Sequence, residues 1–338
     1  MTDYEQTLQS SDFKDRKTGL VVFGILHIIA GGFCALTVPF MILGMLASAF
    51  VDDTSAPSMS PTMMIPAVLF YVLLAVWFIC MGIGSIKARR WARALVLVTS
   101  WLWLISGTIG LVFVMLIMPD IYDQMGQSEQ MPPGAAIFMK YVLLAFMAVF
   151  YLIIPAVLVL FYGSKNVKAT CQFRDPQVRW TDKCPLPVLA LSLISGFWAV
   201  SMLFMGLYGW TLPFFGFILS GIKGAAVALI VMLLSVYIAW GMYRLDIKAW
   251  WCAVLLIIAW ALSAAITFSR VSLMDYYEKM NFPKQQLDII KQYSIPQDYT
   301  LALFFGFSVV ALLGYLLYTR RYFLHPPEQQ STLQQMLY

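Results

Sequence analysis

Charged residues are scarce in this sequence. Asp, Glu, Lys and Arg make up 12% of its 338 residues, hydrophobic residues make up 61%, and the mean hydropathy is +0.79. Soluble domains are about half apolar and about a quarter charged. A water-soluble domain of the present composition would lack the polar residues to cover its surface, so the common classes of soluble protein are excluded.

Histidine, cysteine and the motifs of catalysis are scarce as well. There are two histidines and five cysteines, and we find no HExxH, no CxxCH, no phosphate-binding glycine loop and no Ser–His–Asp set with an interpretable spacing. Cys171 and Cys184 alone are too few ligands for a zinc site. One histidine in the apolar runs excludes haem held by two histidines of one chain. We therefore expect no cofactor, no metal and no enzymatic activity.

The apolar residues fall in long runs. Eight of them approach or exceed the roughly 20 residues that a helix needs to cross about 30 Å of hydrocarbon. They cover residues 19–46, 63–84, 91–118, 136–162, 185–209, 219–243, 249–270 and 299–318. The sequence thus predicts an all-α polytopic membrane protein with about eight transmembrane helices. The first run is too long for a signal-peptide core and should remain as a span.

Lys and Arg are distributed unequally between the two sides of the predicted membrane. If the N-terminus is cytoplasmic, 16 of the 22 Lys and Arg residues lie on the cytoplasmic side. Cytoplasmic loops carry such an excess, so we expect both termini in the cytoplasm and, from the compact loops, a bacterial cytoplasmic (inner) membrane. The net charge of +5 then indicates a basic rim that faces the lipid bilayer, with no nucleic-acid partner.

Several segments of the first half recur in the second half in the same order. DIYDQM (120–125) recurs as DYYEKM (275–280), GFCALTVPFMIL (32–43) resembles GFWAVSMLFMGL (196–207), and FICMGIGSIKARRWARAL (78–95) matches YIAWGMYRLDIKAWWCAV (237–254) at an offset of 159. This pattern predicts two tandem four-helix repeats. Because four spans return the chain to its starting side, the repeats share one orientation and a parallel pseudo-two-fold arrangement.

The predicted organisation has five parts. They are a cytoplasmic N-terminal segment (1–18), the first four-helix repeat (19–163), a cytoplasmic linker (164–184), the second four-helix repeat (185–320) and a cytoplasmic tail (321–338).

Four acids are candidates for an outer vestibule. Asp120 and Asp123 in the first repeat correspond to Asp275 and Glu278 in the second, and each pair is three residues apart, on one face of a continuing helix. The four carboxylates could concentrate cations or hold a metal. The simpler interpretation, which we favour, is a solvated collar above the membrane, since neither histidine nor cysteine joins them.

Two further residues are candidate intramembrane polar groups. His27 is the only histidine in a predicted span, and ionisable residues inside a membrane are functional suspects. A proton relay is conceivable, but we favour a neutral imidazole that hydrogen-bonds within the protein. Arg270 lies at the outer end of the seventh span, where it could bind an anion or extend to headgroups.

Two further features are hydroxyl groups inside the predicted spans and an apolar outer loop. Ser106, Thr108, Ser263 and Thr267 lie in the third and seventh spans. They could line a polar path, although such hydroxyls more often bond to their own helix. The apolar and aromatic loop 208–221 is expected to lie in the membrane interface or to re-enter the membrane.

Taken together, these features predict a non-enzymatic integral membrane protein, either a structural or accessory subunit or a lipid-facing scaffold. Every Asp and Glu lies outside the predicted spans, which weakens an ion-coupled transport mechanism. The alternative is a channel or facilitator whose path follows the axis between the repeats. A partner membrane protein or a second copy of the chain is an expected partner of the scaffold.

Overall fold

The computed structural model describes most of the chain. Its backbone is described for residues 13–50, 61–126, 133–280, 282, 287–288 and 298–324. Side chains are described for residues 13–46, 65–115, 138–280, 282, 287–288 and 305–324.

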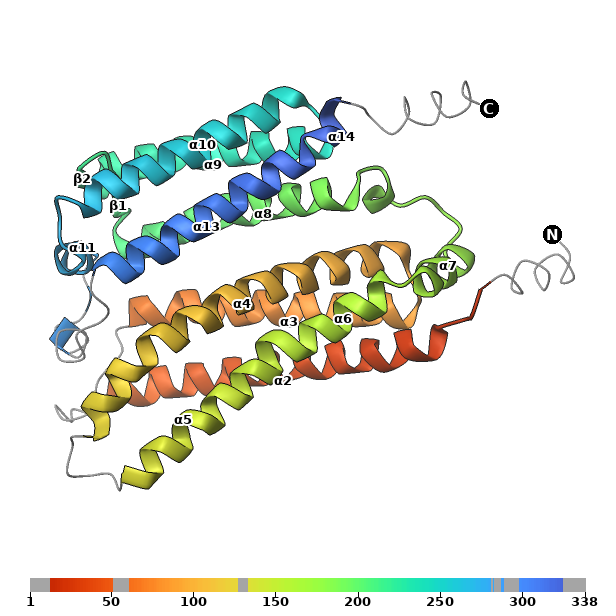
Figure 1. Cartoon of the computed structure of the whole chain (residues 1–338), viewed down its shortest axis with the longest axis horizontal. Helices are drawn as coiled ribbons and strands as arrows, with labels where there is room; N and C mark the ends of the chain where they lie inside the picture. The colour runs from red at the N-terminus through yellow and green to blue at the C-terminus, as the bar shows by residue number, and fades with distance from the viewer. Residues whose placement is uncertain are drawn as a thin grey trace, which may run out of the picture. The chain divides into compact units, whose positions relative to one another are not determined.

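Seven helices within this described part are long and apolar enough to cross a membrane. Their apolar stretches are Lys17–Leu46, Ile65–Ile86, Arg90–Met115, Phe138–Gly163, Leu186–Tyr208, Gly221–Tyr243 and Ile247–Phe268. They coincide with the first seven predicted spans to within three residues at each end. The helical, multi-pass membrane class is therefore confirmed (Figure 1).

The eighth predicted span, residues 299–318, falls on α13 (Asp298–Thr319), a helix of 22 residues. Its side chains are described only from residue 305 onward. The count of eight spans thus stays a prediction.

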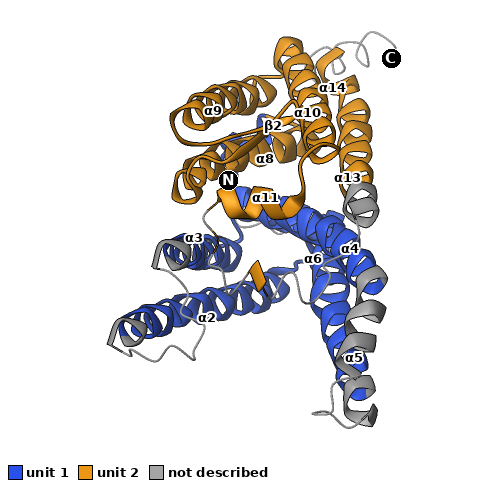
Figure 2. Cartoon of the chain, turned by 90° about the vertical axis from the view of Figure 1, so that its left-hand side faces the viewer, with its two compact units in different colours: residues 1–183 blue, residues 184–338 orange. Residues whose placement is uncertain are grey.

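The chain forms two compact units, residues 1–183 and 184–338 (Figure 2). Unit 1 contains α2 (Lys17–Phe50), α3 (Pro61–Ile86), α4 (Arg90–Gly126), α5 (Pro133–Ala148), the π-helical turn η1 (Val149–Ile153), α6 (Ile154–Gly163), α7 (Lys165–Arg174) and the 3₁₀ turn η2 (Trp180–Asp182). Most of the segment 164–184, predicted as a linker, is thus folded into unit 1.

Helices α2 and α3 run side by side as a tight hairpin (Figure 1). A side chain at Gly24 would meet the backbone of Gly82 and Ile86, and a side chain at Gly82 would meet the backbone of Gly24 and Ile28. Small residues allow membrane helices to approach closely, so that dispersion contacts replace the missing hydrophobic drive.

The fourth span of unit 1 is interrupted by a π-helical turn. Pro155 has no N–H and cannot donate to the preceding turn, and the irregular turn η1 lies directly before it. The interruption beside Pro155 therefore takes the form of a local π turn between α5 and α6.

Unit 2 contains α8 (Leu186–Phe204), the 3₁₀ turn η3 (Met205–Tyr208), β1 (Leu212–Phe214), β2 (Phe217–Leu219), α9 (Gly221–Tyr243), α10 (Ile247–Phe268), α11 (Leu273–Lys279), α13 and α14 (Arg321–Leu324). The two short strands pair antiparallel, with Leu212 opposite Leu219 and Phe214 opposite Phe217. The loop 208–221 is thus a β-hairpin, and its strand character was not predicted.

The two units contain the same helix–turn–helix corner. In unit 1 it joins α3 to α4 with Ala88 at φ 49°, and in unit 2 it joins α9 to α10 with Leu245 at φ 59°. The amide of Arg89 donates to Gly84 O in the first corner, and that of Asp246 donates to Gly241 O in the second. These residues are 157 apart, two fewer than the sequence comparison gave. The corners are equivalent, while duplication of the whole unit stays a prediction.

Candidate functional site

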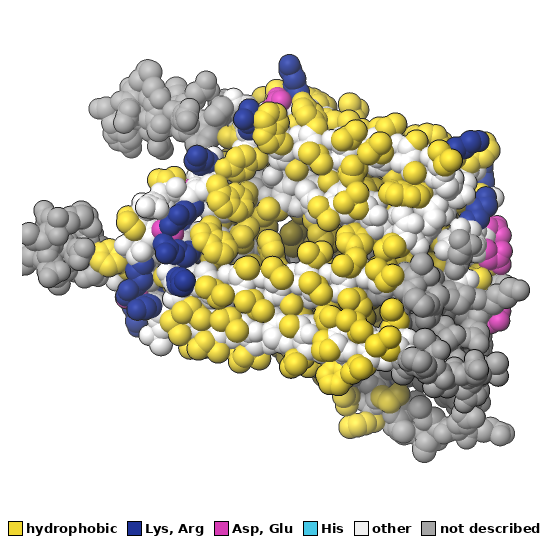
Figure 3. Space-filling view, turned by 180° about the vertical axis from the view of Figure 1, so that it is seen from behind, with side chains coloured by type: hydrophobic (Ala, Val, Ile, Leu, Met, Phe, Trp, Pro, Cys, Tyr) yellow, Lys and Arg dark blue, Asp and Glu magenta, His cyan; other side chains and the backbone are white. Residues whose placement is uncertain are grey.

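Most of the described Lys and Arg side chains of unit 1 lie at one end of its helices, the end that carries α7 (Figure 1 and Figure 3). Ser164 begins α7 because its hydroxyl accepts a hydrogen bond from the amide of Val167 (3.3 Å). Val167, Thr170 and Cys171 form the buried face of this helix, and their spacing is that of one helical stripe. Asp175 and Pro176 follow, and the proline prevents the helix from continuing.

Asp175 is the centre of a charged cluster in unit 1. Its carboxylate is almost completely buried, with 1% of the side chain exposed. It accepts hydrogen bonds from Nη2 of Arg179 (2.7 Å), from Nη1 of Arg89 (3.3 Å) and from the backbone amide of Arg90 (3.3 Å). Since Arg90 is the first residue of α4, Asp175 also caps that helix from a distant part of the sequence.

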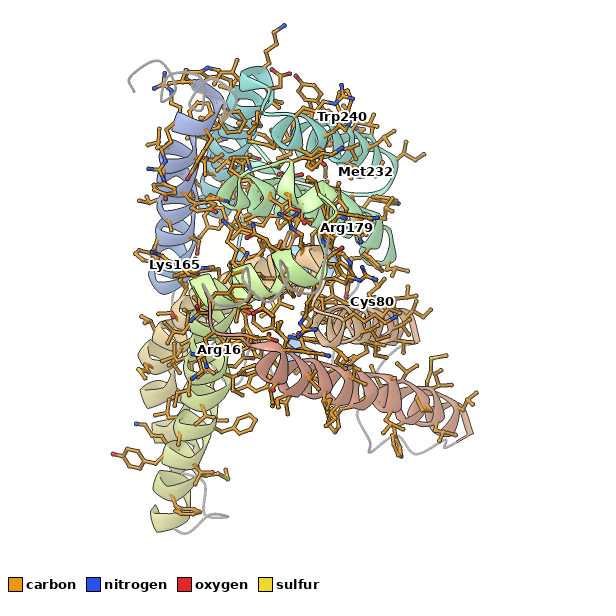
Figure 4. The ribbon with its side chains drawn as sticks, turned by 90° about the vertical axis from the view of Figure 1, so that its right-hand side faces the viewer. Arg16, Cys80, Lys165, Arg179, Met232 and Trp240 are labelled. Atoms are coloured by element: carbon orange, nitrogen blue, oxygen red, sulfur yellow. The ribbon has the colours of Figure 1, made fainter. Side chains whose placement is uncertain are left out.

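Asp182 supplies a second carboxylate to the cluster. It pairs with Nε of Arg90 (3.2 Å) and accepts a hydrogen bond from the backbone amide of Arg179 (2.9 Å). Figure 4 shows the end of unit 1 on which Arg16, Lys165 and Arg179 lie. The two acids thus connect the start of α4 to the segment that follows α7.

The charges of the cluster determine how its groups titrate. Hydrogen bonds from Arg179, together with the amide of Arg90 and the charge of Arg89, lower the pKa of Asp175 below its ordinary value. Burial raises the pKa of the Cys171 thiol to about 11 and that of Cys184 to about 12. Both thiols are therefore neutral at physiological pH and weak as nucleophiles or metal ligands.

Two buried polar atoms near the cluster have no hydrogen-bond partner. They are Nε of Arg93, in the first turn of α4, and the hydroxyl of Thr181, in η2. Thr181 is 3% exposed, whereas Arg93 as a whole is partly exposed. Buried polar groups are almost always paired, so these two atoms are exceptions among the described residues.

His27 lies in a different environment. It is 7% exposed, and its Nδ1 lies 2.7 Å from the carbonyl oxygen of Phe23, one turn earlier in α2. The rings of Phe78 and Tyr162 pack around it. The Tyr162 hydroxyl bonds to Ser85 (2.6 Å). These contacts support the interpretation of His27 as a hydrogen-bonded group of the helix packing.

The outer acids are only partly described. Asp275 and Glu278 are exposed on α11, which begins where the Ser272 hydroxyl accepts from the amide of Asp275 (3.1 Å). Asp120 and Asp123 lie on the helical backbone of α4, but their side chains fall outside the described residues. A vestibule formed by all four therefore stays a prediction.

The hydroxyls of the seventh span hold the β-hairpin of unit 2. Ser263 accepts from the amide of Phe215 (3.0 Å) and donates to Pro213 O (3.1 Å). Thr267 accepts from the amide of Gly216 (3.0 Å) and donates to Ser263 O (2.7 Å). Backbone N–H and C=O groups without a hydrogen-bond partner are costly at membrane depth. Because the two hydroxyls pair with such groups of the hairpin, the hairpin can pack beside the last turns of α10.

Arg270 lies beside the turn of the same hairpin. Its side chain lies 3.3 Å from the point that a Cβ on Gly216 would occupy. Phe215 and Gly216, at the centre of the turn, both have positive φ (41° and 97°), which is typical of a two-residue hairpin turn. The Arg270 side chain thus lies beside Gly216, whose positive φ favours glycine. Its role as an anion site stays a prediction.

The sequence analysis missed the cluster around Asp175 and Asp182. One signal was present, because these are the only two acids in a segment that is otherwise basic. Among the described residues, no group of three or more His, Cys, Asp or Glu side chains is placed to hold a metal ion. Comparisons with protein-family models, with curated proteins and with solved structures find no match.

Proposed function

We propose that this integral membrane protein is a non-enzymatic structural or accessory subunit that holds other membrane components through its helix surfaces. The main observation behind the proposal is that polar side chains in the described spans form hydrogen bonds to neighbouring helices of the same unit. Ser85 donates to Leu20 O (2.9 Å), Ser192 to Ala239 O (2.6 Å) and Trp250 to Leu316 O (2.9 Å). Each bond joins two helices of the same unit, so these groups stabilise the bundle.

Other hydroxyls of the spans bond within their own helices. Ser106 donates to Leu102 O, Thr108 to Leu104 O and Ser235 to Val231 O. A hydroxyl whose proton is bonded to a carbonyl of its own helix is poorly placed to coordinate a permeating ion. This use of hydroxyls favours a scaffold over a channel or facilitator.

The sides of the helices present a large apolar surface. Figure 3 shows hydrophobic side chains along the helices of each unit. Phe33 (68% exposed) and Phe40 (72%) in α2, Phe138 (71%) and Leu160 (75%) in the fourth span, and Ile222 (90%) in α9 are examples. Such surfaces suit lipid chains and the helices of a partner alike, because membrane helices associate through close packing and not through exclusion of water.

The direct test is native mass spectrometry of the protein extracted gently from its own membrane. The proposal predicts a partner membrane protein, or a second copy of the chain, at fixed stoichiometry. A lone chain that carries only lipid would remove the support for an accessory subunit. Labelling of single cysteines placed in residues 1–12 and 325–338 would test the proposed cytoplasmic position of both termini.

A flux assay separates the scaffold from the channel. Liposomes with the purified protein should show no cation flux above that of empty liposomes. Flux that falls when Asp120, Asp123, Asp275 and Glu278 are all changed to the corresponding amides would contradict the scaffold and assign the carboxylates to a channel mouth.

A further inference from the structure

The arginine–aspartate cluster of unit 1 has more positive than negative groups. Three guanidinium groups, those of Arg89, Arg90 and Arg179, pair with the carboxylates of Asp175 and Asp182. A fourth, that of Arg93, pairs with neither carboxylate but is close enough to Asp182 to feel its charge. Asp175 pairs with Arg89 and Arg179, and Asp182 pairs with Arg90. The acids thus compensate two of four charges, and the Nε of Arg93 has no acceptor at all.

A second unpartnered atom lies in the same cluster. The Thr181 hydroxyl is buried without a hydrogen-bond partner, and its neighbour Asp182 bonds to the first turn of α4. The unpartnered guanidinium N–H of Arg93 can only donate a hydrogen bond, whereas the Thr181 hydroxyl can donate or accept one. A ligand that completes the cluster must therefore offer an acceptor to Arg93, and the surplus of positive charge favours a negatively charged ligand.

In unit 2, the position equivalent to Arg93 is occupied by a side chain that has a hydrogen-bond acceptor. Arg93 and Trp250 are equivalent, because each donates its backbone amide to the carbonyl of the residue directly before its corner helix, Arg89 O and Asp246 O respectively. The indole Nε1 of Trp250 donates to Leu316 O at 2.9 Å, and the side chain is 1% exposed. The same place in unit 1 holds a donor without an acceptor.

We propose that Arg93, with the start of α4 and the neighbouring arginines, binds the oxyanion of a phosphate group. A guanidinium presents paired N–H donors that match two phosphate oxygens, and the positive end of a helix dipole adds to the attraction. The phosphate belongs either to an anionic phospholipid or to a soluble phosphate compound. The proposal concerns unit 1 alone and does not depend on the scaffold function.

Two probes distinguish these sources. The first is phosphatidylglycerol, added to delipidated protein in detergent and followed by native mass spectrometry, with phosphatidylcholine for comparison. The second is inorganic phosphate, followed by thermal shift against sodium chloride of equal ionic strength. Retention of phosphatidylglycerol alone assigns a lipid headgroup, and stabilisation by inorganic phosphate assigns a soluble phosphate. If the wild-type protein responds to neither probe, the proposal is overturned.

Matched variants locate the site. Arg93→Gln should weaken binding about tenfold or more, the expected result of losing charge-assisted hydrogen bonds. Arg93→Lys keeps the positive charge but loses the paired N–H donors of the guanidinium, so it should bind phosphate more weakly than the wild type. This variant tests the site even if Arg93→Gln fails to fold. Arg244→Gln is the control, since Arg244 lies 3.8 Å over the ring of Trp240 in unit 2, and it should bind like the wild type. A folded variant at position 93 with wild-type affinity would overturn the proposal.

Discussion

The two corners of this protein have the same backbone and different chemistry. Both turn through a residue with positive φ, and in both a glycine packs on an alanine, Gly84 on Ala92 and Gly241 on Ala249. In unit 2 the helix α10 is capped locally, because Asp246 accepts from the amide of Lys248 (2.9 Å). In unit 1 the carboxylate that caps α4 comes from Asp175, about 85 residues along the chain. The backbone shape of a corner therefore depends on steric contacts, while the acid that caps its helix can be local or distant in the sequence.

This difference predicts an unequal cost of removing the two capping acids. Asp175→Ala should destabilise the protein by about 2–3 kcal/mol, because it leaves two arginines and an amide without their acceptor, although solvent screens the exposed part of each arginine. Asp246→Ala should cost about 1 kcal/mol, the usual value of a local cap. Thermal unfolding of both variants in one detergent measures the difference, and equal losses would contradict the distinction between the corners.

The glycine–alanine contact is common to both corners, so we expect its disruption to destabilise both units equally. A methyl group on Gly84 would collide with the Cβ of Ala92, and one on Gly241 with the Cβ of Ala249. Gly84→Ala and Gly241→Ala should each cost about 1–3 kcal/mol through overpacking. The control is Gly32→Ala, since a Cβ at Gly32 meets no other atom within 4 Å. If only one of the two corner variants is destabilised, the corners are not equivalent.

A smaller effect is expected at the position where unit 2 has a tryptophan. Trp250→Phe removes the hydrogen bond to Leu316 O and should cost about 1 kcal/mol, because the carbonyl keeps a hydrogen bond from the Thr319 hydroxyl (2.8 Å). Trp251→Phe is the matched control, since Trp251 is 49% exposed, and it should change stability by less than about 0.5 kcal/mol. Thermal unfolding measures both, and similar losses would show that the buried indole has no special role.

The sequence was sufficient to predict the parts that depend on hydropathy. Seven apolar helices lie where the runs predicted them, because a run of some 20 apolar residues has few alternatives to a spanning helix. The repeat itself stays a prediction, but the two corners correspond at an offset two residues smaller than the predicted one. Matching Trp91 with Trp250 and Gly82 with Gly241 by similarity gives an offset of 159. The packing of Gly84 on Ala92 and of Gly241 on Ala249 corresponds to 157.

The polar sites were harder to predict for a physical reason. The bonds of Asp175 to Arg89 and Arg90 join residues about 85 apart, and such contacts leave no periodic signal in the sequence. The hydroxyls of Ser263 and Thr267 were recognised as candidates, but their hairpin partners were not, since the strands are only three residues long. A two-residue turn with Phe215 and Gly216 lacks the usual Asn-Gly or Asp-Gly signature.

The pH dependence of stability gives the smallest expected effect and isolates the charge of Asp175. Its pKa in the folded protein is below the ordinary value because Arg179 and its neighbours bind the ionised form. Between the two values the unfolded chain binds more protons than the folded one, so stability falls as the pH falls. The contribution of Asp175 should be complete above about pH 5 and should decline as the pH passes below about 4. Thermal unfolding between pH 7 and pH 3 should therefore show a steeper loss for the wild type than for Asp175→Asn, which has no charge to lose. Parallel curves for the two proteins would mean that the arginines stabilise unit 1 equally well without that charge.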